Sequence, residues 1–402
     1  MTVFESLQNI QASPTMAVTQ RARELREGGA DVLALGAGEP DFATPDFVQD
    51  AIVKALHAGE TRYTPVDGTP ALKKAVIDKF ARENNLTYNN DQITAGTGGK
   101  QICFNALAAS LKPREEVLIP APYWVSYPAM TILAGGVPKI IECPRADGYK
   151  LTPKTLAATI TNKTRWLILN SPNNPTGAAY HHDELAALAE VLRKHPKVWV
   201  LSDDIYEHII YDDFVFHTLA QVAPDLADRI LIVNGVSKSY AMTGLRLGYG
   251  AGPASLIGAI RKLQSHTTSN PSSISQAGAV AALNGPQDFL YEWREAFRRR
   301  RDACLESLQR APGITCTRPE GAFYLFADVT ELVGTTTPDG QAITDDVALC
   351  RYLLEDKHVA VVPGTAFGMA GHFRLSYATS DAILAQACER IAKAAGTLKG
   401  SS

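Results

Sequence analysis

Long hydrophobic runs are missing from this sequence of 402 residues. Its longest apolar stretches, such as residues 250–259, are interrupted by glycine and proline and fall short of the roughly 18 residues of a membrane helix. The first 13 residues have no basic patch followed by an apolar block, so we expect no secretory signal. These absences predict a cytoplasmic protein that does not enter a membrane.

An excess of positive charge is also missing. The chain has 39 basic and 42 acidic residues, for a net charge of −3, so nucleic acid held by bulk charge is not expected. Among its six cysteines, no two are closer than Cys304 and Cys316, which excludes CxxC redox pairs and zinc ribbons. We therefore expect thiols packed in the core and no metal site. No internal repeat of solenoid length is found.

Short apolar segments rich in β-branched residues alternate with helical patterns in the middle of the chain. The clearest helix is expected over residues 183–195, where leucines recur on one face and basic residues cluster at the end. Alternation of this kind predicts an α/β fold with a parallel sheet covered on both faces. The expected strands are residues 116–120, 137–142, 165–170, 198–202 and 229–233.

The pattern changes at about residue 289. A long charged helix (291–309), a strand (321–328), a helix (344–356) and two further strands (358–362 and 372–377) predict a smaller α+β unit. We thus predict a large domain over residues 46–288 and a small domain over residues 289–402. Residues 1–45 have no sheet of their own and are expected to pack on the small domain.

Residues 233–250, VNGVSKSYAMTGLRLGYG, are the most informative segment. Lys238 follows a strand directly and is flanked by small residues, which suits a reactive amine that must approach another group closely. Arg246 is near enough in sequence to share a pocket and to bind a phosphate with two hydrogen bonds. Taken alone, the segment also fits a solvated loop with a surface arginine.

Three other segments carry polar groups at strand or helix ends. Residues 94–100, TAGTGGK, precede a helix expected over 101–111 and offer backbone N–H groups to an anion. Lys100 opposes the helix dipole there, so we expect an anion to compensate it. Residues 170–177, NSPNNPTG, and the pair Asp203–Asp204 each end a strand. Singly, each segment also fits ordinary turn or cap chemistry.

Together, the order of these segments resembles the pyridoxal-phosphate enzymes of fold type I. The match is nearest to class I aminotransferases and, among them, to the branch of bacterial aspartate aminotransferases. This resemblance implies a mostly parallel seven-stranded sheet between helices and a smaller α+β domain. It covers residues 13–380 and rests on LGAGEPDF (35–42), YTPVDG (63–68), GTGGKQ (96–101), APYWVSYP (121–128), NSPNNPTG (170–177), SDDIYE (202–207), VSKSYAMTGLRLGY (236–249) and FRLSYATS (373–380).

The resemblance implies pyridoxal 5'-phosphate as cofactor, joined covalently to the catalytic Lys238. Asp203 would keep the ring nitrogen protonated, Tyr206 and Asn174 would bind its phenolic oxygen, and Trp124 would stack on the ring. The enzyme would be a homodimer with shared active sites. The phosphate would be held by Gly98, Gly99, Lys100, Ser237, Arg246 and Tyr63 of the partner subunit.

The same resemblance implies where the substrate binds. Arg374 would grip the α-carboxylate with a bidentate pair, and Lys100 would bind the second carboxylate of a dicarboxylic substrate. The implied substrate-binding residues are Gly38, Lys100, Trp124, Asn174, Arg374, Ser13 and Thr15.

The predicted reaction converts L-aspartate and 2-oxoglutarate to oxaloacetate and L-glutamate in two half-reactions. Aromatic, alanine or prephenate aminotransferase activity and carbon–sulfur lyase activity stay open, because substrate choice depends on few contacts. Gln11 stands where relatives that accept prephenate often carry a lysine, so aminotransferase activity with prephenate is less expected.

Two rival classes outside the aminotransferases are disfavoured. The 34 residues before LGAGEPDF are too few for the helix-turn-helix of a transcription regulator. A nicotinamide oxidoreductase would need a GxGxxG after its first strand, which is absent.

Overall fold

The apolar runs in the middle of the chain form parallel strands of one sheet. The structure, a computed structural model, describes residue 10 and residues 14–400. Within them the largest sheet has seven strands in the order β2-β8-β7-β6-β5-β3-β4. The adjacent strands β4, β3, β5, β6 and β7 all run parallel, so the predicted mostly parallel sheet is confirmed. The strands are β2 (Ile93–Gly96), β3 (Glu116–Ala121), β4 (Val137–Glu142), β5 (Thr164–Asn170), β6 (Trp199–Asp203), β7 (Ile230–Gly235) and β8 (Gly248–Ala251).

Strand β8 was not predicted as a strand from the sequence. It runs antiparallel to both β7 and β2 and closes the segment that carries Lys238 and Arg246. Its glycines allow a very close approach, because a Cβ on Gly248 would collide with the backbone of Gly99. The strand therefore brings the end of the lysine segment against the start of α5 (Gly99–Ser110).

Helices cover both faces of this sheet, which explains why its strands read as continuous apolar runs. In β5, Leu167 and Leu169 join one core while Trp166 and Ile168 join the other. The helices of the first face are α3 (Asp46–His57), α4 (Pro70–Asn84), α7 (Pro153–Thr159), α8 (His182–Arg193), α9 (Leu219–Val222) and α11 (Ser273–Asn284), and those of the second are α5, α6 (Ser126–Leu133) and α10 (Ala254–Ser265).

Local sequence signals set the ends of several helices. At α4, the Thr69 side chain accepts a hydrogen bond from the Leu72 N–H at 3.2 Å, and Pro70 occupies the first turn. The predicted helix over 183–195 is found as α8. Its start is fixed by Glu184, whose carboxylate accepts from the His181 N–H at 2.8 Å.

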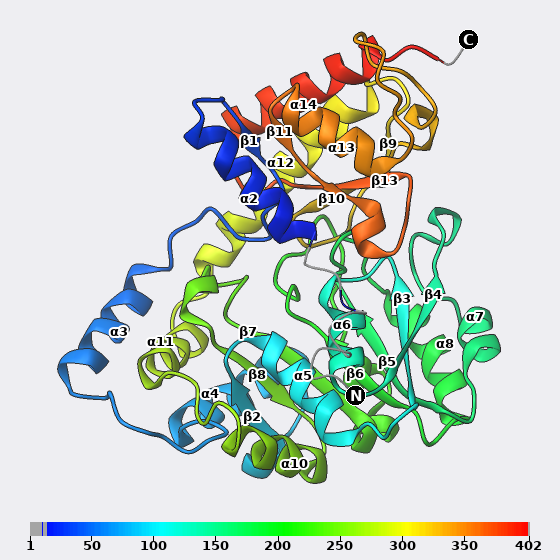
Figure 1. The fold of residues 1–402 in the computed structure, drawn as a ribbon. Coiled ribbons are helices and arrows are strands. Elements are labelled where there is room, and N and C mark those ends of the chain that lie inside the picture. Colours follow the sequence, from blue (N-terminus) through cyan, green and yellow to red (C-terminus); the bar gives the residue numbers. More distant parts are fainter. Residues whose placement is uncertain (1–9, 11–13, 401–402) are drawn as a thin grey trace, which may run out of the picture.

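A smaller unit lies above the large sheet in Figure 1, in yellow to red. Its antiparallel sheet has the order β12-β13-β10-β9 and packs against helices from the same part of the chain. This is the predicted α+β arrangement. Its elements are α12 (Asp288–Gln309), β9 (Thr315–Cys316), β10 (Tyr324–Asp328), α13 (Asp346–Glu355), β12 (Val362–Pro363), β13 (His372–Ser376) and α14 (Asp381–Thr397).

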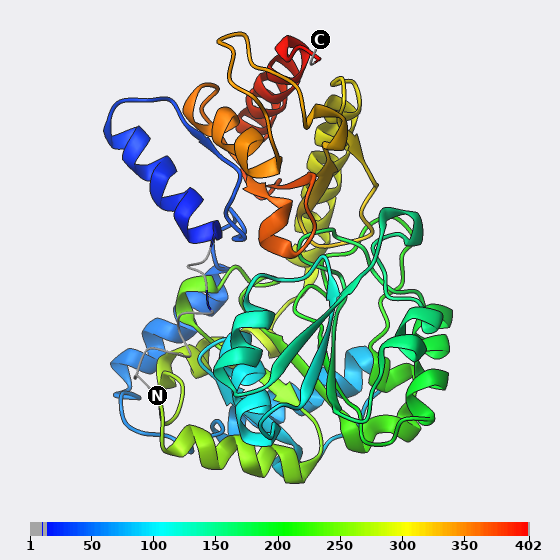
Figure 2. The ribbon, with the colours of Figure 1, turned by 45° about the vertical axis from the view of Figure 1, so that its right-hand side comes forward.

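Helix α2 and strand β1, in dark blue, lie beside this smaller unit rather than beside the large sheet, as Figures 1 and 2 show. Helix α2 (Pro14–Glu27) precedes β1 (Leu33–Ala34), which pairs in parallel with β11 (Val359–Ala360). An ion pair of 2.7 Å joins Arg21 to Glu355. These contacts join α2 and β1 to the smaller unit, while the packing of residues 1–45 as one segment and the boundaries at 45 and 288 stay predictions.

Two predictions from composition concern the whole chain. In the described range 14–400, no helix has both the length and the apolar character needed to span a membrane. All six cysteines lie in that range, and all are free and buried, as expected of core thiols.

Candidate active site

Strand ends that carry polar side chains meet at the carboxyl edge of the large sheet. The register pairs Asn170, which ends β5, with Asp203, which ends β6, and pairs Asp203 with Val233 of β7. The chain leaves β7 at Gly235 and reaches Lys238 shortly afterwards. Ligands of open α/β sheets bind at this edge.

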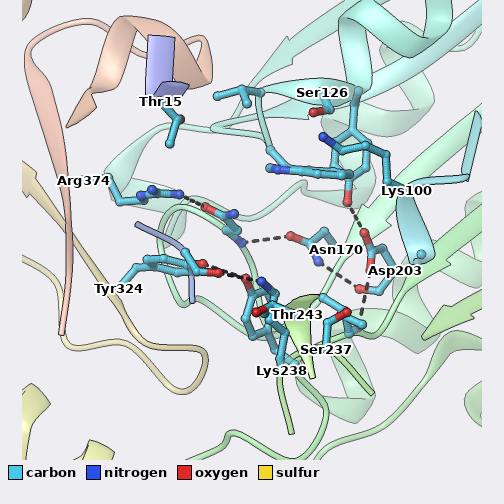
Figure 3. A pocket seen from close by; sticks show the side chains of 18 of the residues that line it. Thr15, Lys100, Ser126, Asn170, Asp203, Ser237, Lys238, Thr243, Tyr324 and Arg374 are labelled. Atoms are coloured by element: carbon cyan, nitrogen blue, oxygen red, sulfur yellow. Dashed lines mark hydrogen bonds between the residues drawn. The ribbon is translucent and has the colours of Figure 1, made fainter. Parts of the chain in front are cut away.

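A cavity of about 320 Å³ lies at this edge, between the large sheet and the smaller unit (Figure 3). Its size falls in the range of roughly 300–1,000 Å³ typical of small-molecule sites. Residues distant in sequence reach it from α2, from both sheets and from the loops between them. The predicted site residues that line it are Thr15, Gly38, Gly99, Lys100, Trp124, Asn174, Asp203, Tyr206, Ser237, Lys238, Arg246 and Arg374.

Lys238 extends its amine across the cavity toward the N-terminal segment. Its Nζ donates a hydrogen bond of 2.6 Å to the Gly38 carbonyl oxygen. The pKa of Lys238 is lowered to about 8, chiefly by burial; the charges of Glu39 and Asp203 oppose this shift, and those of Arg374 and Arg246 add to it. A lysine with this pKa has a substantial neutral fraction near physiological pH, as a nucleophile or base requires.

Asp203 is a buried carboxylate at the end of β6. Its Oδ2 accepts a hydrogen bond of 2.6 Å from the Tyr127 hydroxyl. Burial raises the pKa of Asp203 to about 6, and the Tyr127 bond and the charge of Lys238 limit the rise. Such a carboxylate is best stabilised by a cation or a protonated ring nitrogen.

Arg374 comes from β13 of the smaller unit and is buried, with 2% of its surface exposed. Its guanidinium donates to Asn174 Oδ1 at 2.9 Å and to the Gly36 carbonyl at 2.5 Å. It also lies over the Tyr324 ring, 4.5 Å from the centroid. Its Nε has no hydrogen-bond partner, and no carboxylate of the described residues pairs with it. A buried guanidinium with a free donor is suited to bind a carboxylate.

Gly98 and Gly99 bring the start of α5 against Arg246. Gly98 has φ +78°, and a Cβ there would collide with the Arg246 guanidinium. Arg246 itself has φ +53° and donates to the Thr243 carbonyl at 2.8 Å. Backbone N–H groups at a helix start, with an arginine beside them, form a cradle for a phosphate.

Lys100 has no carboxylate partner within residues 14–400, so no side chain there supplies the anion expected from the sequence. Its Nζ lies over the Trp124 ring, 4.9 Å from the centroid. Burial lowers the pKa of Lys100, and the positive charge of Arg246 adds to the effect. In Figure 3, Lys100 and Arg374 approach the pocket from different sides.

Two of the predicted residues that the structure describes, Gly98 and Tyr63, do not line the cavity. Gly98 lies behind Arg246 instead, at the base of the cradle. Tyr63 is 92% exposed on the surface, away from this cavity, and was predicted to act in the partner subunit. Ser13, like Gln11, falls outside the described residues.

Several lining residues were missed in the sequence analysis, among them Asn170, Tyr127 and Tyr324. Asn170 Oδ1 accepts from the Asn174 N–H at 2.9 Å and so fixes that loop. The hydroxyls of Tyr206 and Tyr324 lie 2.7 Å apart. Two of the three fall within noted segments: Asn170 opens NSPNNPTG, and Tyr127 belongs to APYWVSYP. Their roles depend on contacts with side chains that are distant in the sequence, and the local sequence pattern does not reveal such contacts.

Comparisons with known proteins show the family and the fold of this chain. The family model "Aminotransferase class I and II" matches residues 30–391. An aspartate/prephenate aminotransferase of Cereibacter sphaeroides is 56% identical over 96% of this chain and 97% of its own length. The structure of the Rhizobium meliloti aspartate aminotransferase is 53% identical, with a TM-score of 0.96 over 98% of this chain and 99% of that one. The Thermus thermophilus aspartate aminotransferase, solved with maleate, is 41% identical, with a TM-score of 0.91 over 98% and 100%.

The separated motifs of the sequence, the strand-end site and these full-length matches point to one family, which uses pyridoxal phosphate. The resemblance inferred from the motifs is therefore confirmed. This chain belongs to the class I and II aminotransferases.

Proposed function

We propose that this aminotransferase transfers the amino group of L-aspartate to 2-oxoglutarate, giving oxaloacetate and L-glutamate. One observation carries the proposal: Lys100, Arg246 and Arg374 face one cavity, and none has a carboxylate partner among residues 14–400. A bound cofactor phosphate and the two carboxylates of the substrate supply three anionic groups. The charges of the site and of its proposed ligands thus match.

The cavity residues fit pyridoxal phosphate as the cofactor. The cradle of Gly99 and Arg246 suits its phosphate, and the buried carboxylate of Asp203 suits a protonated ring nitrogen. Lys238 supplies the amine that condenses with an aldehyde. When bound, pyridoxal phosphate provides the electron sink that stabilises negative charge on the substrate α-carbon.

The chain's own residues bind the substrate and move the proton. Arg374 holds the α-carboxylate, which orients the bond from the α-carbon to its hydrogen. Lys238 accepts that proton at Nζ, because its lowered pKa of about 8 leaves it partly neutral. Tyr206, Asn174 and Trp124, which line the same cavity, hold the ring in place.

Lys100 selects a second carboxylate on the substrate in this proposal, and Thr15 at the start of α2 lines the same cavity. Support comes from the Thermus thermophilus relative, whose structure contains maleate, a four-carbon dicarboxylate. Prephenate is a second candidate substrate because it also carries two carboxylates and is named for the Cereibacter sphaeroides relative. Other relatives are named for aspartate alone.

We also propose a homodimer in which each active site is completed by the partner subunit's Tyr63. The exposed tyrosine at 92% would then be buried by assembly. Val53 and Leu56 of nearby α3 are about half exposed, at 51% and 50%, and would share the interface. Size measurements on the protein and on a Tyr63→Ala variant, with titration of the cofactor, test this arrangement.

The experiment for the proposed function is a steady-state comparison of aspartate, alanine and phenylalanine as amino donors. We expect aspartate to have the highest kcat/KM with 2-oxoglutarate. In Lys100→Met, kcat/KM for aspartate should fall about 10- to 100-fold, because one charged pair is lost. The value for alanine should change less than about threefold. Equal losses for both donors would contradict the role of Lys100.

A further inference from the structure

A buried polar network lies behind the segment that carries Lys238. It joins α4 to the residues after β6 and to the end of β7, and none of its members lines the cavity. The comparisons assign it no role. We call it the back cluster: Lys79, Glu83, Asn84, Glu207, His208, Asn234 and Ser239.

Charges in the back cluster are paired. Lys79, whose side chain is fully buried, forms an ion pair with Glu207, lies 3.5 Å from Glu83 Oε2 and donates to Asn84 Oδ1 at 2.8 Å. Burial raises the pKa of Glu83, but the His208 hydrogen bond and nearby positive charges lower it to about 2. Glu83 is therefore ionised at physiological pH. Lys79 and Arg82, whose guanidinium lies 2.6 Å from Glu83 Oε1, already balance the charges of the two carboxylates, so we assign no metal ion there.

His208 connects this charged pair to the residue after Lys238. Its Nε2 lies 2.8 Å from Glu83 Oε2, and its Nδ1 lies 3.1 Å from the Ser239 hydroxyl. A carboxylate beside Nε2 favours the proton on that nitrogen, which leaves Nδ1 of the neutral ring to accept from Ser239. Carboxylate, imidazole and hydroxyl occur in the same order in serine hydrolases. Here Ser239 is only 2% exposed, so no substrate reaches it.

A second contact fixes the chain before Lys238. Asn234 Nδ2 donates to Glu207 Oε1 at 2.7 Å, and its Oδ1 accepts from the Gly235 N–H at 2.7 Å. Consecutive residues after β6 thus anchor both flanks of Lys238: Glu207 through Asn234, and His208 through the serine that follows the lysine. The lysine side chain faces the cavity while its flanks are held from behind.

We propose that His208 is a positioning residue for Lys238, acting through the hydroxyl of Ser239. This inference rests on the proposed function. A lysine side chain has four rotatable bonds, so the direction of its backbone decides whether Nζ reaches the reacting carbon. Displacement of a reacting group by about 1 Å can cost up to roughly 100-fold in rate. Fixing the backbone at residue 239 reduces that displacement.

Two substitutions of His208 separate its two hydrogen bonds. His208→Asn places an amide oxygen near the position of Nδ1 and can still accept from Ser239. His208→Gln places an amide nitrogen near the position of Nε2 and can still donate to Glu83. We compare both with Ser239→Ala and with the double variant of Ser239→Ala and His208→Gln.

Four quantities are measured for each variant: kcat and KM for aspartate with the holoenzyme, the rate at which visible absorbance develops when pyridoxal phosphate is added to the apoprotein, and Tm. We expect Ser239→Ala and His208→Gln to lower kcat and the absorbance rate about tenfold, with KM for aspartate changed less than about twofold. His208→Asn should keep at least about half of both values, and the double variant should be no slower than either single one.

Ser110→Ala is the matched control. It also removes a serine hydroxyl bonded to an aromatic ring nitrogen, Trp166 Nε1 at 2.9 Å, but lies far along α5 from the cradle. It should lower Tm by a similar amount and leave both rates unchanged. A lower Tm with wild-type rates in Ser239→Ala, or additive losses in the double variant, would overturn the proposal.

The same measurements distinguish this inference from the proposed function. If wild-type protein fails to transaminate aspartate, the proposed function is wrong, yet the absorbance rate still reports how Lys238 is positioned. Normal aspartate turnover in wild type together with unchanged absorbance rates in Ser239→Ala and His208→Gln would refute the inference alone.

Discussion

The cavity and the back cluster lie on opposite sides of the Lys238 segment. The buried cation of the back cluster is paired with a carboxylate, whereas the buried cation of the cavity is not. Behind the segment, Lys79 is fully buried and paired with Glu207. In front of it, Arg374 is 2% exposed, keeps its Nε without a partner and has no carboxylate beside it in the described chain. An unpaired buried charge is costly, so its presence indicates a ligand that is to be bound. The paired charges indicate a scaffold.

The largest expected effect comes from removing the amine at the centre of the cavity. Lys238→Ala should lower kcat for aspartate at least about 1,000-fold, because the proposed nucleophile and the proposed proton acceptor are both lost. Stopped assays of oxaloacetate and the visible spectrum of the purified variant measure this. Retention of the wild-type spectrum and rate would remove Lys238 from the chemistry.

Replacement of the unpaired guanidinium should have the next largest effect. In Arg374→Ala, kcat/KM for aspartate should fall about 100- to 1,000-fold, because a charge-assisted bidentate pair is lost. Arg374→Lys keeps the positive charge but lacks the planar guanidinium that makes two parallel hydrogen bonds, so it should restore only part of the rate. A loss confined to aspartate, with alanine unaffected, would contradict binding of the α-carboxylate, which both donors share.

Stability measurements sharpen the contrast between the two regions. Lys79→Met leaves Glu207 buried without its cation and should lower the free energy of unfolding by about 3–5 kcal/mol. Arg374→Met removes an unpaired buried charge, so its apoprotein should be at least as stable as wild type. Denaturant unfolding of both apoproteins measures the difference. Equal destabilisation by the two substitutions would erase the distinction.

The smallest expected effects are pH dependences of opposite sign. In the apoprotein, the Lys238 pKa is lowered from 10.5 to about 8, so the folded state binds fewer protons in that range. Stability should therefore rise as pH increases from about 8 to 10.5, and Lys238→Met should lack this rise. The Asp203 pKa is raised from 3.8 to about 6, so stability should fall as pH rises through that range, but not in Asp203→Asn.

Glu83 in the back cluster should give a pH dependence of stability opposite in sign to that of Asp203. Its pKa is lowered from 4.5 to about 2, so its stabilising contribution is complete above pH 4.5 and is lost as pH falls toward 2. Acid unfolding of wild type and Glu83→Gln measures this contribution. A variant with the same dependence below pH 4.5 as wild type would contradict the pairing described for Glu83.

Two site residues stand out from local patterns that need no tertiary information, whereas others, such as Trp124 and Arg374, were implied only by the family resemblance. Lys238 follows a strand among small residues, and Asp203 ends a strand next to a second aspartate. Tyr127 was missed as a partner of Asp203 because the two are 76 residues apart and only the fold brings their side chains to 2.6 Å. Tyr324 meets Tyr206 across 118 residues for the same reason.

The fold was predictable where burial on both faces produced apolar runs, as in β5. It was not predictable in β8, where close backbone packing requires glycine and removes the hydrophobic pattern. The back cluster was also missed. Its charged residues on α4 look like an ordinary solvated helix face, and only the fold brings Lys79 to Glu207, where its side chain is fully buried.

The most direct test of the central claim compares succinate with butyrate as inhibitors of the holoenzyme. The two molecules have the same carbon chain and differ by one carboxylate, so the ratio of their dissociation constants reports whether the cavity binds two carboxylates. We expect succinate to bind at least about 100-fold more tightly in wild type, and this ratio to fall about tenfold or more in Lys100→Met. Equal affinities for the two molecules in wild type would contradict the account.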